Sequence, residues 1–213
     1  MTAFPTLPVL LAAALLVASP AFADSNANRP ELHVGDRWSW QHTNALVNER
    51  DFTRIEDIVE VGGSAIRSRI RTKGVTGNLI ATYTPDFNLV DNPTVRFDPS
   101  LRRFDFPLST GKKWTGEFDK ALLNTGKHGK FYLKSEVLAV EKVTVPAGTF
   151  DAYKISTVYD ATGTDQDANS GQTNEIHWYA PEIRNDVKVE TTFVQDGMVR
   201  SKDTLELLEY SLR

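Results

Sequence analysis

The segment that most constrains the fold spans residues 138–155. It contains two runs rich in β-branched and aromatic residues, separated by Pro-Ala-Gly-Thr at 146–149. Proline fixes φ early in a turn and glycine accepts backbone angles that other residues avoid, so the pattern predicts a β-hairpin. A four-residue loop would place Glu141 opposite Lys154, and a three-residue loop with a bulge would shift this register by one residue.

Most of the remaining chain repeats this pattern. Short runs in which apolar and polar residues alternate are interrupted by Gly, Pro, Asn and Asp, and residues 24–213 lack convincing helical periodicity. The sequence therefore predicts a single all-β domain over residues 24–213. We expect a single curved antiparallel sheet or half-open barrel of roughly ten to twelve strands, mostly connected as a meander.

A second clear hairpin joins residues 51–61 to residues 64–73 through Gly62 and Gly63. A two-residue glycine loop would place Glu56 opposite Arg69 on a charged face of the sheet. Basic residues follow one another along this face, which is either a solvated strand surface or an anion site. The basic residues are Arg67, Arg69, Arg71 and Lys73.

The N-terminus has the pattern of a signal peptide over residues 1–23. An apolar run at 7–17 is followed by Ala21-Phe22-Ala23, which suits cleavage before Asp24. A transmembrane anchor is the alternative, but Pro20 interrupts the run and no basic stop-transfer cluster follows it. The sequence thus predicts a periplasmic or secreted protein without a membrane anchor in its mature form.

Composition excludes several functional classes. The chain has no cysteine, which removes disulfides, thiolate metal ligands, cysteine nucleophiles and lipid attachment to an N-terminal cysteine. Its formal net charge of −4 argues against nonspecific nucleic-acid binding. No cofactor-binding motif is present, and we expect no cofactor.

Four tryptophans are the predicted ligand-binding residues. Trp38 and Trp40 alternate on one face of an expected strand, and Trp114 and Trp178 begin or end other strands. In a curved sheet, such aromatic groups either fill the core or line an apolar cavity. The second interpretation predicts a site for an apolar small molecule or lipid.

Metal and catalytic sites receive weaker support. Asp165, Asp167 and Asn169 place oxygen ligands at alternating loop positions, as calcium requires, but the template glycine and final acid are missing. Glu175 and His177 would share a strand face, and His42 could join them. Because no nucleophile elbow, zinc-binding helix motif or phosphate-binding loop occurs, no catalytic residue is predicted.

An irregular segment follows at residues 92–109. It contains three prolines and several large apolar residues, which are too many for a free linker. We expect it to lie pinned across one opening or edge of the sheet, where it could also act as a lid.

Residues 143–155, with the sequence Val-Thr-Val-Pro-Ala-Gly-Thr-Phe-Asp-Ala-Tyr-Lys-Ile, resemble a family of uncharacterised secreted bacterial β-sheet proteins. Trp-Tyr-Ala-Pro at 178–181, Val-Lys at 187–188, Phe-Pro-Leu at 106–108 and Gly-Lys-Lys-Trp at 111–114 are similar to the same pattern. The resemblance implies a Gram-negative envelope setting and a curved sheet distantly similar to periplasmic lipoprotein carriers and lipocalins. It supplies no catalytic residues, and the missing cysteine departs from lipid-anchored members.

These observations predict a non-catalytic protein that binds an apolar ligand or an envelope protein within its curved sheet. One alternative is a protein–protein adaptor that acts through a sheet edge. Another is a metal-dependent hydrolase that uses Glu175, His177 or the loop at 165–171.

Overall fold

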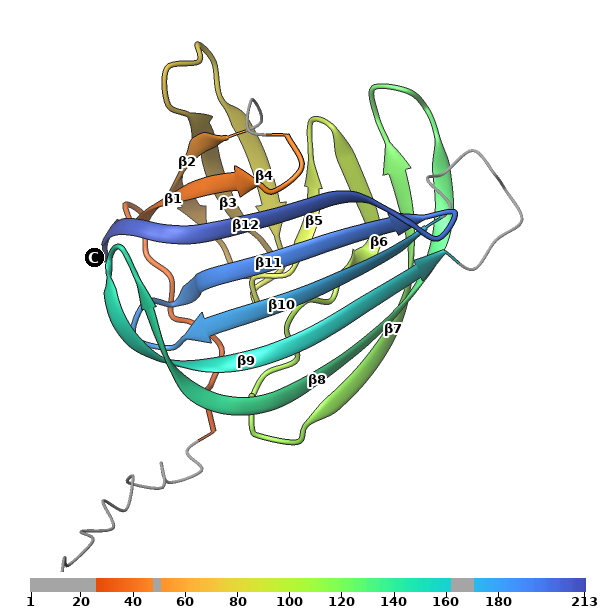
Figure 1. Cartoon of the computed structure of the whole chain (residues 1–213). Coiled ribbons are helices and arrows are strands. Elements are labelled where there is room, and N and C mark those ends of the chain that lie inside the picture. The colour runs from red at the N-terminus through yellow and green to blue at the C-terminus, as the bar shows by residue number, and fades with distance from the viewer. Residues whose placement is uncertain (1–25, 48–50, 162–170) are drawn as a thin grey trace, which may run out of the picture.

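The structure is a computed structural model in which residues 26–47, 51–161 and 171–213 are described. These residues form 12 antiparallel strands and no helix, and β1 pairs with both β2 and β12 to close a barrel (Figure 1). The predicted all-β meander is confirmed, and its closure is complete. The strands are β1 (Arg37–Asn44), β2 (Phe52–Val61), β3 (Ile66–Thr72), β4 (Leu79–Tyr83), β5 (Leu89–Asn92), β6 (Val95–Leu101), β7 (Lys113–Leu122), β8 (His128–Val145), β9 (Gly148–Ala161), β10 (Gln172–Ala180), β11 (Asn185–Gln195) and β12 (Met198–Ser211).

The predicted signal peptide, residues 1–23, lies outside the described residues. Within the described part of the chain, no helix has the length and hydropathy needed to cross a membrane.

The two ends of the barrel differ (Figure 1). Irregular segments 26–36, 102–112 and 181–184 close the end at the lower left of the view. Backbone hydrogen bonds run both ways between Ala27 and Leu108, at 2.9 and 2.7 Å, and fix the first two segments together. The segment predicted to lie across an opening therefore forms β6 and then part of this fixed closure.

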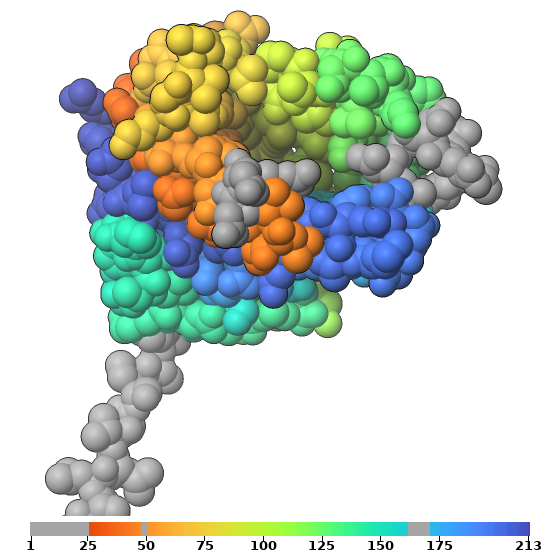
Figure 2. Space-filling view, turned by 45° about the horizontal axis from the view of Figure 1, so that its top comes forward, coloured from red at the N-terminus to blue at the C-terminus, as the bar shows by residue number. Residues whose placement is uncertain are grey.

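Short connections surround the opposite end, which we call the open end. They include residues 73–78, 93–94, 123–127 and 196–197. Figure 2 shows that the molecule is hollowed here, between the gold and green hairpins on one side and the orange and blue strands on the other.

Alternation along the strands places one set of side chains inside the barrel. In β9, Ile155, Thr157 and Tyr159 are buried, whereas the residues between them are half-buried. Two apolar clusters result. The first is built around Trp38, and the second includes an aromatic group contributed by β6, β7, β8 and β9, namely Phe97, Phe118, Phe131 and Tyr159.

The β2–β3 hairpin differs from its predicted register. Its loop covers residues 62–65, and a bulge lies between Ile58 and Glu60. Glu56 therefore lies opposite Ile70, and Asp57 lies opposite Arg69. The predicted pairing of Glu56 with Arg69 is wrong, because the bulge adds a residue to β2 and reverses which of its side chains face inward.

The β8–β9 hairpin also has neither of its two predicted registers. Its loop contains only Pro146 and Ala147, so that Glu141 lies opposite Ala152. Gly148 permits this tight connection because its φ of 142° is rarely adopted by other residues. The Ala147 N–H donates to the carbonyl of Leu207 on β12 at 3.0 Å, which ties the hairpin tip to the closed end of the barrel.

Candidate functional site

The structure does not gather the four predicted tryptophans into one site. The rings of Trp38 and Trp40 stack with centroids 6.3 Å apart, and their indole N–H groups donate to the carbonyls of Ile183 and Asp186. Trp114 belongs to the second apolar cluster and Trp178 to the first. All four are buried, and Trp40 lines the interior cavity described below.

The remaining two tryptophans also have protein partners. Trp114 donates its indole N–H to the carbonyl of Arg102 at 3.0 Å, and Trp178 donates to Glu141 at 2.7 Å. The ammonium groups of Lys154 and Lys188 each lie 5.3 Å from the Trp178 ring. These contacts give both residues a structural role.

The predicted calcium ligands Asp165, Asp167 and Asn169 lie outside the described residues. Among the residues that the structure describes, no group of three His, Asp or Glu side chains could hold a metal ion.

A cavity lies inside the barrel, and part of its lining comes from residues at the closed end. Its volume is about 30 Å³, or about 330 Å³ when the open space at its mouth is included. One or two water molecules would fill the smaller volume. Its lining mixes charged and apolar groups from β1, β2, β4, β11, β12 and the segments that close the barrel: Trp40, Arg54, Glu56, Tyr83, Phe87, Arg103, Asn185, Asp186, Val189 and Leu205.

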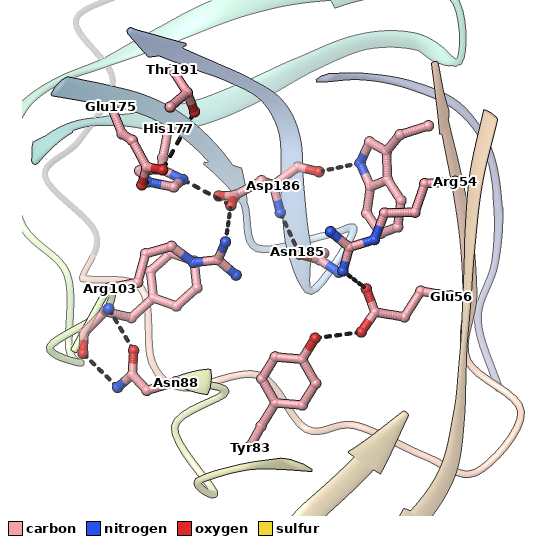
Figure 3. Close-up of polar contacts among 12 residues, drawn as sticks. Arg54, Glu56, Tyr83, Asn88, Arg103, Glu175, His177, Asn185, Asp186 and Thr191 are labelled. Carbon is pink, nitrogen blue, oxygen red and sulfur yellow. Dashed lines mark hydrogen bonds and ion pairs between the residues drawn. The ribbon is translucent and has the colours of Figure 1, made fainter. Parts of the chain in front are cut away.

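Glu56 organises one side of this cavity (Figure 3). Its carboxylate accepts hydrogen bonds from Ser68 at 2.5 Å, from Tyr83 at 2.6 Å and from Arg54 at 2.8 Å. These partners come from β3, β4 and β2, which are neighbours in the barrel. Burial and the negative charge of Glu56 raise the pKa of Tyr83, so its hydroxyl remains a donor.

On the other side of the cavity, the lining residue Asp186 is held by the buried side chain of His177. Its Nε2 lies 2.9 Å from Glu175 and its Nδ1 lies 3.0 Å from Asp186. Burial would lower the pKa of His177, but Asp186 and Glu175 raise it to about 9. Burial would likewise raise the pKa of Glu175, whereas His177, Tyr159 and Arg103 lower it to about 2. Near neutral pH these groups are therefore charged.

This arrangement limits the chemistry of His177. A protonated imidazole that donates from both nitrogens has no lone pair for a proton or a metal ion. The residue is also fully buried. Its geometry suits a structural cation between two carboxylates better than a general base.

Arg103 enters the cavity from the segment that closes the barrel. Asn88 holds this segment in place, since its side chain bonds both the N–H and the carbonyl of Phe104, at 2.8 and 2.9 Å. The Arg103 guanidinium lies 5.1 Å from the centre of the Phe104 ring and 3.8 Å from Asp186 (Figure 3). Among the described residues it donates no hydrogen bond.

Two further atoms at the cavity lack partners. Within the described part of the chain, Nε of Arg54 and Oδ1 of Asp186 are buried and make no hydrogen bond. Leaving such groups unpaired costs about 1–3 kcal/mol each, and more when they are charged. The cavity is therefore built to hold water or a polar group that supplies both an acceptor and a donor.

The sequence identified part of this cluster. Glu175 and His177 do share a strand face, as predicted, but His42 is not with them and instead lies 3.1 Å from Asp203. Sequence reasoning missed the cavity residues Arg54, Glu56, Tyr83, Arg103 and Asp186. Arg54 and Glu56 lie two residues apart on β2, and this spacing could have indicated that both share one face. The incorrect hairpin register assigned that face to the outside.

Several solved structures resemble this one. A candidate lipoprotein from Parabacteroides distasonis is 14% identical over 89% of this chain and 100% of its own, with a TM-score of 0.55. A candidate exported protein with a YmcC-like fold from Bacteroides fragilis is 13% identical over 88% and 100%, with a TM-score of 0.53. The hypothetical lipoprotein YmcC from Escherichia coli is 8% identical over 81% and 84%, with a TM-score of 0.50.

At these identities the likeness shows a shared fold alone. No protein-family model and no curated protein sequence matches the chain.

Proposed function

We propose that this chain is a non-catalytic protein of the bacterial envelope that holds a small molecule inside its barrel. The observation that carries this proposal is the interior cavity, which is lined by Arg54 and Asp186, two residues that each carry a buried polar atom unpaired within the described chain. A core that served stability alone would pair these atoms or replace them with apolar groups. The envelope setting is supported by the apolar N-terminus with its cleavage pattern and by the names of the structural neighbours.

The ligand would enter from the open end, because the opposite end is closed by packed segments. Phe104, Leu108 and Ile183 are almost fully buried there. Part of the cavity lining is aromatic, namely Trp40, Tyr83 and Phe87, which suits the apolar or lipid-like ligand that the sequence predicts. The described part of the site lacks a nucleophile beside a free base, so we assign it binding and no reaction.

Native mass spectrometry of protein purified from a periplasmic fraction tests this proposal. We expect a bound small molecule that organic extraction releases. Val189→Phe would fill the cavity, since Val189 lines it and is 8% exposed. Glu190→Phe, at the adjacent exposed position, is the matched control.

The Val189→Phe variant should lose the bound molecule while it keeps the circular dichroism spectrum of the wild type, and Glu190→Phe should retain the molecule. Wild-type protein that carries nothing, and that binds no added lipid-like probe, would contradict the proposal.

The adaptor alternative depends on a different surface. Each strand of the barrel has a neighbour on both sides, but residues 139–145 of β8, which follow a bulge at Leu138, extend beyond β7 and pair, among the described strands, with β9 alone. This is the stretch of strand edge that a partner chain would use. This function would be favoured if the protein, purified free of bound lipid, captures an envelope protein and the Leu138→Lys variant does not.

A further inference from the structure

Arg103 has hydrogen-bonding capacity that the described residues do not use. A guanidinium carries five N–H donors in a planar fork that matches a carboxylate or phosphate. Arg103 contacts a phenylalanine ring on one side and lies 3.8 Å from Asp186 on another, which is an ion pair without a hydrogen bond. Its side chain is 25% exposed and lines the cavity, so these donors can be reached from the cavity.

The charges around the cavity favour a negative group. Each carboxylate there already has a cationic partner, since Glu56 bonds Arg54, and His177 lies between Glu175 and Asp186. Arg103 shares Asp186 with His177 and lies 3.8 Å from this carboxylate without a hydrogen bond, so Arg103 is, among the described residues, the cation at the cavity that has no carboxylate of its own.

Asp186 adds a second requirement. Its Oδ2 faces His177 and Arg103, but its buried Oδ1 has no donor within the described chain. A purely anionic group would meet this oxygen with repulsion. A hydroxyl or amide N–H next to the anion would instead donate to it.

A group of aromatic side chains adjoins these charged residues. Tyr159 donates its hydroxyl to Glu175 and contacts the ring of Phe118, with 6.3 Å between centroids. Phe118 in turn stacks on Phe131 at 5.6 Å and meets the edge of Phe97 at 5.6 Å. These side chains form a continuous aromatic cluster on β6–β9, which would offer apolar contacts to a hydrocarbon chain that enters from the open end.

We infer that the ligand of the barrel is an anionic amphiphile whose head group binds Arg103 and carries a hydroxyl or amide N–H that donates to Asp186. Its hydrocarbon tail lies along this aromatic cluster toward the open end. This inference rests on the proposed function and specifies the chemistry of the ligand. A wholly apolar molecule would leave the charged side chains at the cavity without water or hydrogen-bond partners. A cationic head group would be repelled by Arg54 and Arg103.

Isothermal titration with four probes tests this inference. β-Hydroxymyristate offers the anion, the hydroxyl and the tail; myristate lacks the hydroxyl; myristyl alcohol lacks the anion; and inorganic phosphate lacks the tail. We expect affinity to fall in that order, by about tenfold or more when the anion is removed, because a hydrogen bond to a charged partner is worth about this much.

Arg103→Met provides the variant and Arg102→Met its matched control. Arg102 is the preceding residue, is 49% exposed and pairs with Asp105 at the surface. Arg103→Met should weaken β-hydroxymyristate binding at least tenfold and leave myristyl alcohol binding within about twofold, and Arg102→Met should change neither. If Arg103→Met fails to fold, Arg103→Lys should keep part of the affinity, since it retains the charge without the fork.

The outcomes separate this inference from the proposed function. Equal affinity for the alcohol and the acid, or unchanged acid binding by Arg103→Met, would overturn the head-group inference while the barrel remained a binding site. If octyl glucoside binds more tightly than β-hydroxymyristate, the barrel prefers a neutral polyol head group to an anion, and this result would also overturn the head-group inference. Failure of all these probes to bind would count against the proposed function itself.

Discussion

Glu56 and Asp57 are neighbours on β2, and their side chains point to opposite sides of the barrel wall. Glu56 faces inward, where it meets Arg54, Ser68 and Tyr83. Asp57 faces outward and forms the centre of a cluster that we call the outer arginine cluster. Its members are Arg37, Arg69 and Arg71, at 3.6, 3.5 and 2.5 Å from the Asp57 carboxylate.

The same kind of ion pair thus has different consequences on the two sides of the wall. The Asp57 side chain is 12% exposed, but the three arginines around it are 36–45% exposed, so water and salt reach their charges and screen them. Inside, the Glu56 side chain is 3% exposed, and water cannot replace a lost partner. We therefore assign the inner groups to stability and binding, and the outer groups to surface charge.

The largest predicted effect comes from Glu56→Ala. The variant leaves the charge of Arg54 and the hydroxyls of Tyr83 and Ser68 without their acceptor inside the barrel. Its free energy of unfolding should fall by about 3–5 kcal/mol in urea titrations, as when one partner of a buried pair is removed. Glu60→Ala is the control, because Glu60 is 59% exposed in its pair with Arg67, and it should change stability by less than about 0.5 kcal/mol. Equal losses in both variants would abolish the distinction between the two sides.

The second prediction concerns pH. The carboxylates beside His177 raise its pKa from 6.5 to about 9, after the opposing effect of burial. The protonated ring therefore stabilises the folded protein fully below about pH 6.5 and loses this contribution as pH rises through 9. The free energy of unfolding should fall by about 2 kcal/mol between pH 7 and pH 9.

His177→Asn should be less stable at pH 7 and should lose this slope. His128→Asn, at an exposed position on β8, should keep it. Glu175 acts in the opposite range, since its pKa of about 2 gives stability that is present above about pH 4.5 and lost as pH falls toward 2. Identical slopes in the wild type and His177→Asn would show that His177 is not a buried cation.

The smallest predicted effect is that of Asp57→Asn. Removing this charge leaves three arginines that can turn into water, so stability should fall by about 1 kcal/mol at low salt. In high salt the loss should shrink toward zero, whereas the loss caused by Glu56→Ala should remain. Urea titrations at two ionic strengths measure both. A loss of several kcal/mol that salt does not change would place Asp57 with the inner groups.

The same two residues show what the sequence could and could not predict. Alternation and turn residues indicated the strands and their meander order correctly, because both follow from local chemistry. The bulge at Ile58 and Glu60 has no clear local signature, and one added residue exchanges the two faces of a strand. The predicted register placed Glu56 on the charged face opposite Arg69, whereas in the structure Glu56 turns inward and Arg69 lies opposite Asp57.

The cavity was harder to foresee because closure of the barrel creates it. Arg103 comes from an irregular segment, and Asp186 follows the turn at 181–184, so neither lies in an alternating pattern that indicates its direction. Glu175 and His177 were identified because they are two residues apart on one strand. Their partner Asp186 is on the adjacent strand β11, and the order of the strands does not show which residues of β11 lie beside Glu175 and His177.

A crystal structure of the protein with β-hydroxymyristate would show directly whether the barrel holds an anionic amphiphile. We expect the carboxylate within hydrogen-bond distance of Arg103, the hydroxyl at Oδ1 of Asp186, and the hydrocarbon chain along Phe118 and Phe131 toward the open end. An interior that contains only ordered water, with the fatty acid absent or bound to the outer surface, would contradict this expectation.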